Sequence, residues 1–374
     1  MRKNILVDIK SIIPLYTQGY VTGIGRSTYE LLKAIHEMDL PFDVTLFSQN
    51  TRGTTARAEF PKFKYLHFYC PDRPFFRKIS NRLKLKHRFV GYDVYHLPNN
   101  TQQQPETFDR AIYTIHDLAI CKYPEMWGVA GNSRYFDELR DNLRNCRGVI
   151  TCSESSRRDI VDFSGVEPSK VSVIPWGVNR ETFKPTFDDT VLKKYDMAPG
   201  YFFSSSCNHP RKNTPVLLKA YTSYLHRGGK RQLVLLNPLE DDIAGYRDLT
   251  DAHRLVTLRG VTDHDLAVLY SFAHCSFVLS SFEGFGLPVV ESLACGTQVI
   301  STRNTSLPEA GGDVVVYLDE ADEHLLCDKI IEVDGVEKQE LLDEEILKAH
   351  LRKFTWGKCA ESYVEYYKQI VGLP

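Results

Sequence analysis

The sequence predicts an α/β protein of two doubly wound domains, each built on a parallel sheet covered by helices. Short apolar runs alternate with amphipathic segments along the whole chain, which is typical of repeated strand–helix units. At 374 residues, the chain is longer than one ordinary hydrophobic core requires. A connector rich in proline and glycine, residues 174–185, separates two series of such units.

Each strand is expected where a short apolar run ends at polar or glycine residues, and each helix where apolar residues recur at helical spacing. The strands expected in the first half are 4–9, 43–48, 94–97, 111–115, 148–151 and 171–174. Those expected in the second half are 201–205, 232–236, 256–258, 276–279, 298–301 and 314–317. The clearest helices are 27–36, 133–146, 154–163 and 214–227.

Composition excludes several classes of protein. A net charge of −2 argues against nucleic-acid binding. Nine cysteines without a CxxC pair indicate neither a disulfide framework nor a zinc site, so we expect a reduced, cytoplasmic protein. Asp8 and Lys10 interrupt the first apolar run, which therefore predicts a strand rather than a signal peptide. No apolar run reaches membrane-spanning length.

Glu283 and Glu291 lie eight residues apart in the most informative segment of the chain. Glu283 follows an apolar run that predicts a buried strand, and Gly284 and Gly286 then allow a tight turn. Pro288 suits the first turn of a helix that carries Glu291. Helix N-termini attract anions, and the two carboxylates would bind hydroxyl groups beside an anion. A sugar linked through a diphosphate to a ribose has this layout. Two isolated glutamates would instead be solvated surface groups.

Arg211 and Lys212 stand between an expected strand and an expected helix, in the segment Ser204–Asn213. The carboxyl ends of parallel strands share one edge of a sheet, so these cations should lie at the same edge as Glu283. Two cations there would neutralise a diphosphate. The alternative is a solvated pair of basic residues.

Two segments of the N-terminal half also carry candidate residues. Thr22–Thr28 (TGIGRST) has two glycines before a helical pattern, and it is either a loop facing a phosphate or substrate or a plain helix start. As a dinucleotide fingerprint it is incomplete, because Thr28 replaces the third glycine. His116 and Asp117 directly follow a strand, which would direct them into a cleft. A histidine there would donate to a sugar hydroxyl or polarise a reacting group, or else serve as a structural hydrogen-bonding residue.

A basic segment, Arg73–Phe89, contains seven lysines and arginines and no acidic residue. Phe76, Ile79 and Leu83 share one helical face, so the segment is suited to contact an anionic membrane surface. Its alternative is a solvated helix that packs by its apolar side.

Two acidic pairs, Asp188–Asp189 and Asp241–Asp242, lie in polar stretches that we expect to be loops. Neither stands where a metal-bound diphosphate would need it. We therefore expect no metal and no other cofactor, with Arg211, Lys212 and helix N–H groups in the metal's role.

These segments together resemble glycosyltransferase family 4, the retaining enzymes with the GT-B fold. The resemblance extends over nearly the whole chain and follows the family's order. Its most specific part is the pair of glutamates with seven residues between them. The matching stretches are Thr22–Thr28, Thr114–Glu125, Thr151–Ile160, Val173–Phe183, Pro210–Asn213, Ser280–Ile300 and Thr305–Asp319.

The resemblance implies two Rossmann-like domains that face an interdomain cleft. Residues 1–175, with a C-terminal helix at about 356–374, would form the acceptor-binding domain. Residues 186–355 would bind the nucleotide sugar, and residues 176–185 would be the linker.

The resemblance also implies roles for single residues. Glu283 would hold hydroxyls of the transferred sugar, and Glu291 would hold the ribose. Arg211 and Lys212 would bind the diphosphate, and His116 would contact the donor sugar near the reacting carbon. The remaining contacts with the donor would come from Gly25, Gly286 and Leu287 at the phosphates and from Val261 beside the base.

We therefore expect a metal-independent, retaining glycosyltransferase at the inner face of the membrane. It would move a hexose from a nucleotide diphosphate to a polyprenyl-diphosphate-linked glycan or a growing polysaccharide of O-antigen or capsule type. GDP-mannose is favoured as donor over a UDP-sugar. Two alternatives stay open: a sugar-nucleotide epimerase of the same architecture and a noncatalytic sugar-nucleotide-binding scaffold. A nicotinamide oxidoreductase is more distant, because the glycine fingerprint is incomplete.

Overall fold

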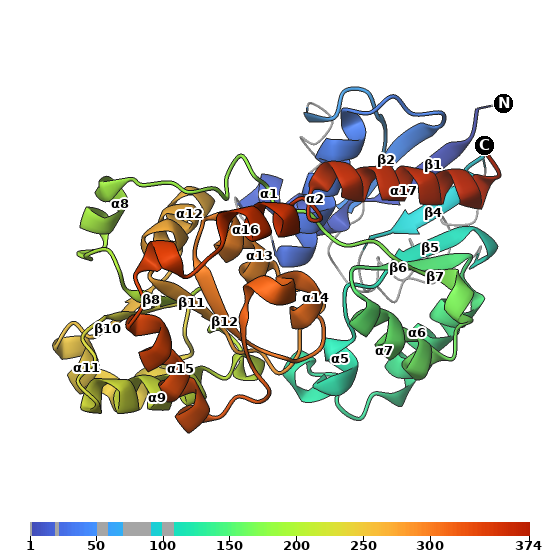
Figure 1. Cartoon of the computed structure of the whole chain (residues 1–374). Coiled ribbons are helices and arrows are strands. Elements are labelled where there is room, and N and C mark those ends of the chain that lie inside the picture. The colour runs from blue at the N-terminus through green and yellow to red at the C-terminus, as the bar shows by residue number, and fades with distance from the viewer. Residues whose placement is uncertain (1, 19–21, 51–58, 70–90, 99–107) are drawn as a thin grey trace. The chain divides into compact units, whose positions relative to one another are not determined.

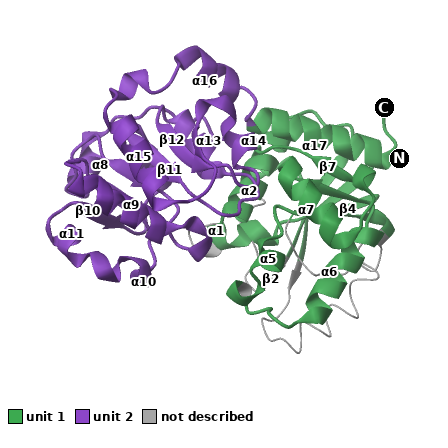
Figure 2. Cartoon of the chain, turned by 60° about the horizontal axis from the view of Figure 1, so that its bottom comes forward, with its two compact units in different colours: residues 1–177, 356–374 green, residues 178–355 purple. Residues whose placement is uncertain are grey.

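The computed structural model describes residues 2–18, 22–50, 59–69, 91–98 and 108–374 (Figure 1). The chain forms two compact units, residues 1–177 with 356–374 and residues 178–355 (Figure 2). Each unit contains a parallel sheet and covering helices, so the predicted fold class is confirmed. The basic segment Arg73–Phe89 lies outside the described residues. None of the helices within the described ranges combines the length and the apolar character needed to cross a bilayer.

The described part of the first unit contains a parallel sheet of seven strands. These are β1 (Asn4–Asp8), β2 (Asp43–Asn50), β3 (Lys64–Tyr69), β4 (Val94–Leu97), β5 (Ala111–Thr114), β6 (Gly148–Thr151) and β7 (Val171–Val173). Their order across the sheet is β3-β2-β1-β4-β5-β6-β7. The helices of this unit include α1 (Ile13–Gln18), α2 (Gly23–His36), α5 (Ala119–Lys122), α6 (Ser133–Asn145), α7 (Glu154–Ser164) and α17 (Trp356–Val371).

Both faces of the first sheet are covered by helices (Figure 1). Successive side chains of a strand point to opposite faces, so Ile5 and Val7 join one core cluster and Leu6 joins the other. The first cluster includes side chains of α2 and α17, and the second includes side chains of α6 and α7. The first cluster therefore joins residues that are far apart in the chain.

A buried polar network joins β4 and β5 to α17. His96 is fully buried, with Nε2 2.8 Å from Thr114 Oγ1 and Nδ1 2.6 Å from the Tyr367 hydroxyl. The Tyr363 hydroxyl lies 3.2 Å from the same threonine oxygen. Burial lowers the pKa of His96 to about 3, so the ring is neutral at physiological pH.

The second unit contains a parallel sheet of six strands, and all of its residues are described. These strands are β8 (Phe202–Ser204), β9 (Leu233–Leu236), β10 (Leu255–Leu258), β11 (Cys275–Val278), β12 (Gln298–Thr302) and β13 (Val316–Leu318). Their order is β10-β9-β8-β11-β12-β13. The helices include α8 (Asp189–Lys194), α9 (Thr214–His226), α10 (Glu240–Ile243), α11 (Arg247–Asp251), α12 (Asp263–Phe272), α13 (Leu287–Ala294), α14 (Leu307–Gly311), α15 (Glu323–Asp334) and α16 (Glu344–Leu351).

Helices α9 and α15 pack on one face of the second sheet, where their side chains share a core cluster with Phe202, Leu233 and Phe277. On β11, Ser276 has Oγ 2.6 Å from Oγ of Ser292, which attaches α13 to the sheet. The helix that carries Glu291 is therefore fixed directly to the strand that precedes Glu283.

The structure differs from the sequence-based predictions in three places. Strand β3 was not predicted. Helix α2 begins at Gly23, four residues before its predicted start, because Thr22 caps it. The prediction of loops at the two acidic pairs was wrong: Asp188 caps α8 through the N–H of Thr190, and Asp241 and Asp242 lie in α10. Asp, like Ser and Thr, favours helix starts because its oxygen accepts from free N–H groups there.

Candidate active site

The strand order of the second sheet reverses between β8 and β11. In open α/β sheets, ligands bind outside the carboxyl ends of the strands at such a reversal. The chain after β8 leads to a short 3-10 helix, Pro210–Lys212, and the chain after β11 leads to Glu283. The topology thus brings together residues that are 71 positions apart.

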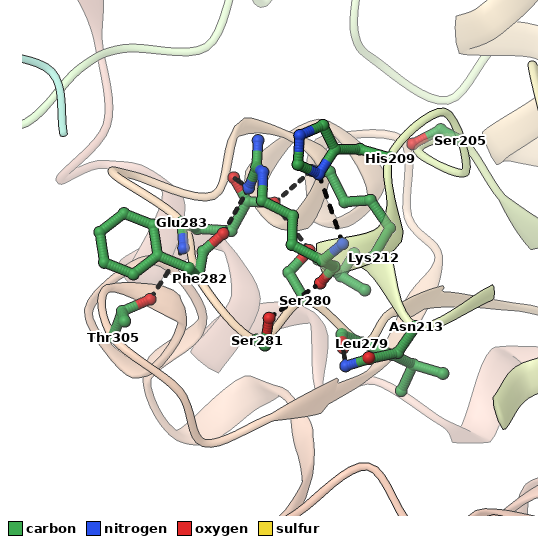
Figure 3. Close-up of polar contacts among 12 residues, drawn as sticks. Ser205, His209, Lys212, Asn213, Leu279, Ser280, Ser281, Phe282, Glu283 and Thr305 are labelled. Atoms are coloured by element: carbon green, nitrogen blue, oxygen red, sulfur yellow. Dashed lines mark hydrogen bonds and ion pairs between the residues drawn. The ribbon is translucent and has the colours of Figure 1, made fainter. Parts of the chain in front are cut away.

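Arg211, Lys212 and Glu283 form a buried ion cluster at this reversal (Figure 3). The Lys212 ammonium donates to Glu283 Oε1, and Arg211 Nη1 lies 3.1 Å from Oε2. Ser280 Oγ donates to Oε1 at 2.7 Å. The side chains of Lys212 and Glu283 are only 7% and 10% exposed. Both adjacent cations therefore contact one carboxylate.

Two opposing effects set the pKa of Glu283. Burial alone would raise the pKa, but the charges of Lys212 and Arg211 and the hydrogen bonds outweigh burial and lower the pKa to about 2. Glu283 is therefore ionised at physiological pH. Burial and the same two cations lower the pKa of neighbouring His209, whose Nδ1 accepts from the Arg211 backbone N–H at 3.3 Å.

The backbone around Glu283 is held from two sides. On the side of β8, the N–H of Ser281 donates to the carbonyl oxygen of Arg211 at 2.8 Å. On the side of β12, Thr305 Oγ1 accepts from the N–H of Glu283 at 2.9 Å. Ser306 Oγ donates to the Glu283 carbonyl oxygen, also at 2.9 Å. Hydrogen bonds thus fix the backbone of Glu283 itself as well as that of nearby Ser281.

The predicted strand, glycine turn and helix follow Glu283 in that order. Gly286 precedes α13 with φ +100°, a conformation that L residues rarely adopt. A Cβ there would lie 3.2 Å from Ala310 Cβ and Leu307 Cδ2, so the glycine also permits close packing of α14. Leu287 is the first residue of α13, and Glu291, further along the helix, is 6% exposed.

Val261 lies in the turn between β10 and α12, at the carboxyl end of its strand. Its neighbour Arg259 donates to the Pro238 carbonyl oxygen at 2.9 Å and to Glu240 Oε1 at 2.5 Å. Strand β9 separates β10 from β8, so Val261 lies on the same sheet edge as the ion cluster but further along it.

His116 lies in the first unit and is 4% exposed. Its Nε2 is 3.2 Å from the Pro98 carbonyl oxygen, and its ring centroid is 5.0 Å from that of Trp176. Burial lowers its pKa to about 4, although the hydrogen bond to Pro98 opposes this shift. The imidazole is therefore neutral at physiological pH.

Gly25 also lies in the first unit, buried in the first turn of α2. Its N–H donates to Thr22 Oγ1 at 3.3 Å. Thr22–Thr28 is therefore the start of a helix, as one of its two interpretations predicted, and not a loop.

Sequence reasoning missed four residues that shape the site: Ser280, Asn213, Thr305 and Ser306. Ser280 stands three residues before Glu283, so its proximity was a usable signal. Asn213 adopts φ +55° and donates to the Leu279 carbonyl oxygen at 2.7 Å. Thr305 and Ser306 stand in the family-like stretch Thr305–Asp319, but nothing in that stretch indicates their contact with Glu283, which depends on the packing of β12 beside β11.

Comparisons with known proteins agree with this architecture. Residues 21–182 match the model of Glycosyltransferase Family 4, and residues 191–343 match that of glycosyl transferases group 1. The O-antigen chain mannosyltransferase B of Escherichia coli is 28% identical over 285 residues, 74% of each chain. A solved sucrose-phosphate synthase from Thermosynechococcus elongatus is 17% identical with a TM-score of 0.73, covering 99% of this chain and 100% of its own.

Anabaena HepE, solved in complex with UDP and glucose, is 15% identical with a TM-score of 0.71. The match covers 98% of this chain and 100% of that one. These solved structures share the fold over nearly the full length, and the two family models together match most of both units. The chain is therefore a glycosyltransferase of the family 4 type, built on the GT-B fold.

Proposed function

We propose that this glycosyltransferase moves a hexose from a nucleotide diphosphate to a lipid-linked or growing polysaccharide, with retention of configuration and without a metal ion. The observation that carries the proposal is the buried cluster of Arg211, Lys212 and Glu283 at the reversal of the second sheet. Its two positive charges and one negative charge leave a net charge of +1. Arg211 Nε is also buried and has no hydrogen-bond partner among the residues that the structure describes, which suits a phosphate oxygen.

In this proposal, Arg211 and Lys212 stabilise the diphosphate as it leaves, and the start of α13 adds backbone N–H groups. The bond between the sugar and the diphosphate breaks first, which gives an oxocarbenium-like state. The acceptor hydroxyl oxygen then bonds to the anomeric carbon on the same face while the departing phosphate takes its proton, so the configuration is retained. Glu283 holds sugar hydroxyls, Glu291 holds the ribose, and neutral His116 acts as a hydrogen-bonding residue.

The remaining donor contacts are proposed at Gly25, Val261, Gly286 and Leu287. GDP-mannose is the favoured donor, because the Escherichia coli relative is named an O-antigen chain mannosyltransferase. The UDP complexes of HepE keep a UDP-sugar as the second choice. A polyprenyl-diphosphate-linked glycan is the favoured acceptor, with residues 73–89 in contact with the inner face of the membrane.

A binding and transfer screen tests the donor. A ligand that binds the folded state raises the melting temperature, so GDP, UDP, ADP and their sugars are compared by thermal unfolding. We expect the largest rise with GDP-mannose and transfer that persists in EDTA. A strict requirement for Mg²⁺ would contradict the metal-free mechanism. An epimer formed from donor alone would indicate an epimerase, and binding without turnover toward any acceptor would indicate a scaffold.

A pair of substitutions tests the ion cluster. Lys212→Ala and Glu283→Ala should each lower transfer by about 100-fold or more, because each removes a fixed charge from the reacting region. Lys219→Ala and Glu323→Ala provide matched controls, since this Lys–Glu pair, 3.6 Å apart in the same unit, is 63% and 36% exposed. Near-normal turnover in folded Lys212→Ala and Glu283→Ala enzymes would refute the assignment.

A further inference from the structure

Two adjacent side chains bind both backbone polar groups of Glu283. Thr305 Oγ1 accepts from its N–H at 2.9 Å, as Figure 3 shows, and Ser306 Oγ donates to its carbonyl oxygen at 2.9 Å. Ser306 is fully buried. The same loop also reaches Ser280, whose carbonyl oxygen accepts from Asn304 Nδ2 at 3.3 Å. The loop after β12 therefore holds both ends of the turn that carries the carboxylate.

Thr305 makes this hydrogen bond while its own backbone is in a strained conformation. Its φ is +47°, in the left-handed region. Among the described residues, the other non-glycine residues with positive φ are Asp196, Asn213, Asn237 and His253. Asn, Asp and His tolerate this region, whereas a β-branched residue rarely adopts it. Such strain persists where the surrounding structure requires one conformation, and it is concentrated at functional sites.

We infer that Thr305 and Ser306 are positioning residues that hold the Glu283 carboxylate in its place for the donor sugar. Glu283 is followed by Gly284 and soon by Gly286, which give the turn little intrinsic rigidity. The two hydroxyl groups supply fixed points, and α14 begins immediately afterwards at Leu307. The inference rests on the proposed function, in which Glu283 binds the transferred sugar.

Three substitutions of Thr305 separate the effect of the hydroxyl group from the effect of the backbone strain. Thr305→Val keeps the shape and the strain but removes the hydroxyl. Thr305→Gly removes both, and Thr305→Ser keeps the hydroxyl. Displacing a reacting group by about 1 Å costs up to about 100-fold in rate. We therefore expect kcat to fall by about 10- to 100-fold in Thr305→Val and Thr305→Gly and to stay near wild type in Thr305→Ser.

The melting temperature reports the effect of the strain separately from kcat. Glycine adopts φ +47° without strain, so Thr305→Gly should melt at a higher temperature than Thr305→Val although both are impaired. Affinity for the free nucleoside diphosphate should not fall below that of wild type, since Glu283 contacts the sugar in the proposal and not the diphosphate. A kcat that instead follows the melting temperature, or a fully active Thr305→Val enzyme, would overturn the inference.

A second measurement does not depend on turnover. Titration of the Glu283 carboxyl, followed by NMR on glutamate-labelled protein with Glu283→Gln to assign the signal, reports the contacts of the carboxylate directly. Its pKa should rise in Thr305→Val and Thr305→Gly and stay unchanged in Thr305→Ser. If the wild type transfers sugar from no donor, the proposed function fails, and the titration still decides the role of Thr305. An unchanged titration in Thr305→Val would reject that role.

Discussion

Glu283 is a buried carboxylate whose neighbours carry more positive charge than it can balance. Lys212 and Arg211 together bring two charges against its one. Buried charges are costly when they lack a partner, so removing one member of such a cluster destabilises a protein by about 3–5 kcal/mol. The same imbalance suits an additional anion. In the proposed function, stability and donor binding would therefore depend on the same three side chains.

Low pH should reduce the stability of the folded protein in part because Glu283 becomes protonated. The pKa of this carboxyl is lowered from 4.5 to about 2 on folding. Its contribution to stability is therefore complete above the unfolded value and is lost as the pH falls toward 2. We expect the difference in melting temperature between wild type and Glu283→Gln to be largest near pH 6 and to shrink steadily below pH 4. A constant difference from pH 6 to pH 3 would show that the charge is unimportant.

Glu283→Gln should also separate diphosphate binding from sugar transfer. In the proposed site, the glutamate competes with phosphate oxygens for Arg211 and Lys212. Removing its charge should tighten the binding of free GDP or UDP by about tenfold, equivalent to about 1.4 kcal/mol, while transfer is lost. Isothermal titration of both proteins measures this. Weaker nucleotide binding by Glu283→Gln would contradict the competition.

Sequence reasoning placed Arg211, Lys212 and Glu283 at one sheet edge, because each follows an apolar strand. The ion cluster itself could not be predicted, since the contact depends on how β8 pairs with β11. The same reason hid Thr305, whose importance lies in a backbone angle and a contact across strands rather than in a residue pattern.

At the scale of elements, the turn into α13 depends on one glycine. Gly286 combines a left-handed backbone with close contact to α14, and Leu287 begins the helix directly after it. The position of the helix N-terminus relative to Glu283 is therefore set by a residue without a side chain.

Gly286→Ala should destabilise the second unit and impair donor binding. The new methyl group would need a strained φ and would press on Ala310 and Leu307 at 3.2 Å, which should cost about 1–3 kcal/mol. Gly357→Ala is the control, because a Cβ in this exposed first turn of α17 meets no atom of the described ranges within 4 Å. Thermal unfolding should show a lower melting temperature for Gly286→Ala alone. Equal melting temperatures would refute the packing argument.

Most strands were predicted to within one or two residues, because buried parallel strands are continuous apolar runs. Strand β3 was missed because its sequence, KYLHFY, contains polar residues and lies at the sheet edge. The first turn of α2 was missed because two glycines obscured the cap at Thr22.

At the scale of the molecule, the first unit is completed by the last helix. Seven side chains of α17 belong to the core cluster that also contains β1 and α2. Among the large ones, Tyr363 and Tyr367 are only 2% and 1% exposed. Burial of one large apolar side chain contributes about 1.5–3 kcal/mol, so the burial lost with the helix is comparable to the 5–15 kcal/mol that stabilises a typical domain.

Deleting residues 356–374 should therefore unfold the first unit while the second keeps its structure. Limited proteolysis should cut within residues 1–177 and spare residues 178–355. Glu361→Ala, an exposed substitution on the same helix, should leave the digestion pattern unchanged. Resistance of the truncated first unit would show that α17 is dispensable.

The position of α17 also has a consequence for synthesis. A ribosome releases residues 178–355 before residues 356–374, so the second unit can close while the first still lacks its final helix. During that interval an apolar surface over β1 and α2 stays uncovered, and such surfaces recruit chaperones or aggregate. Slow translation of residues 356–374 should therefore prolong this interval and lower the share of this enzyme that reaches its native state.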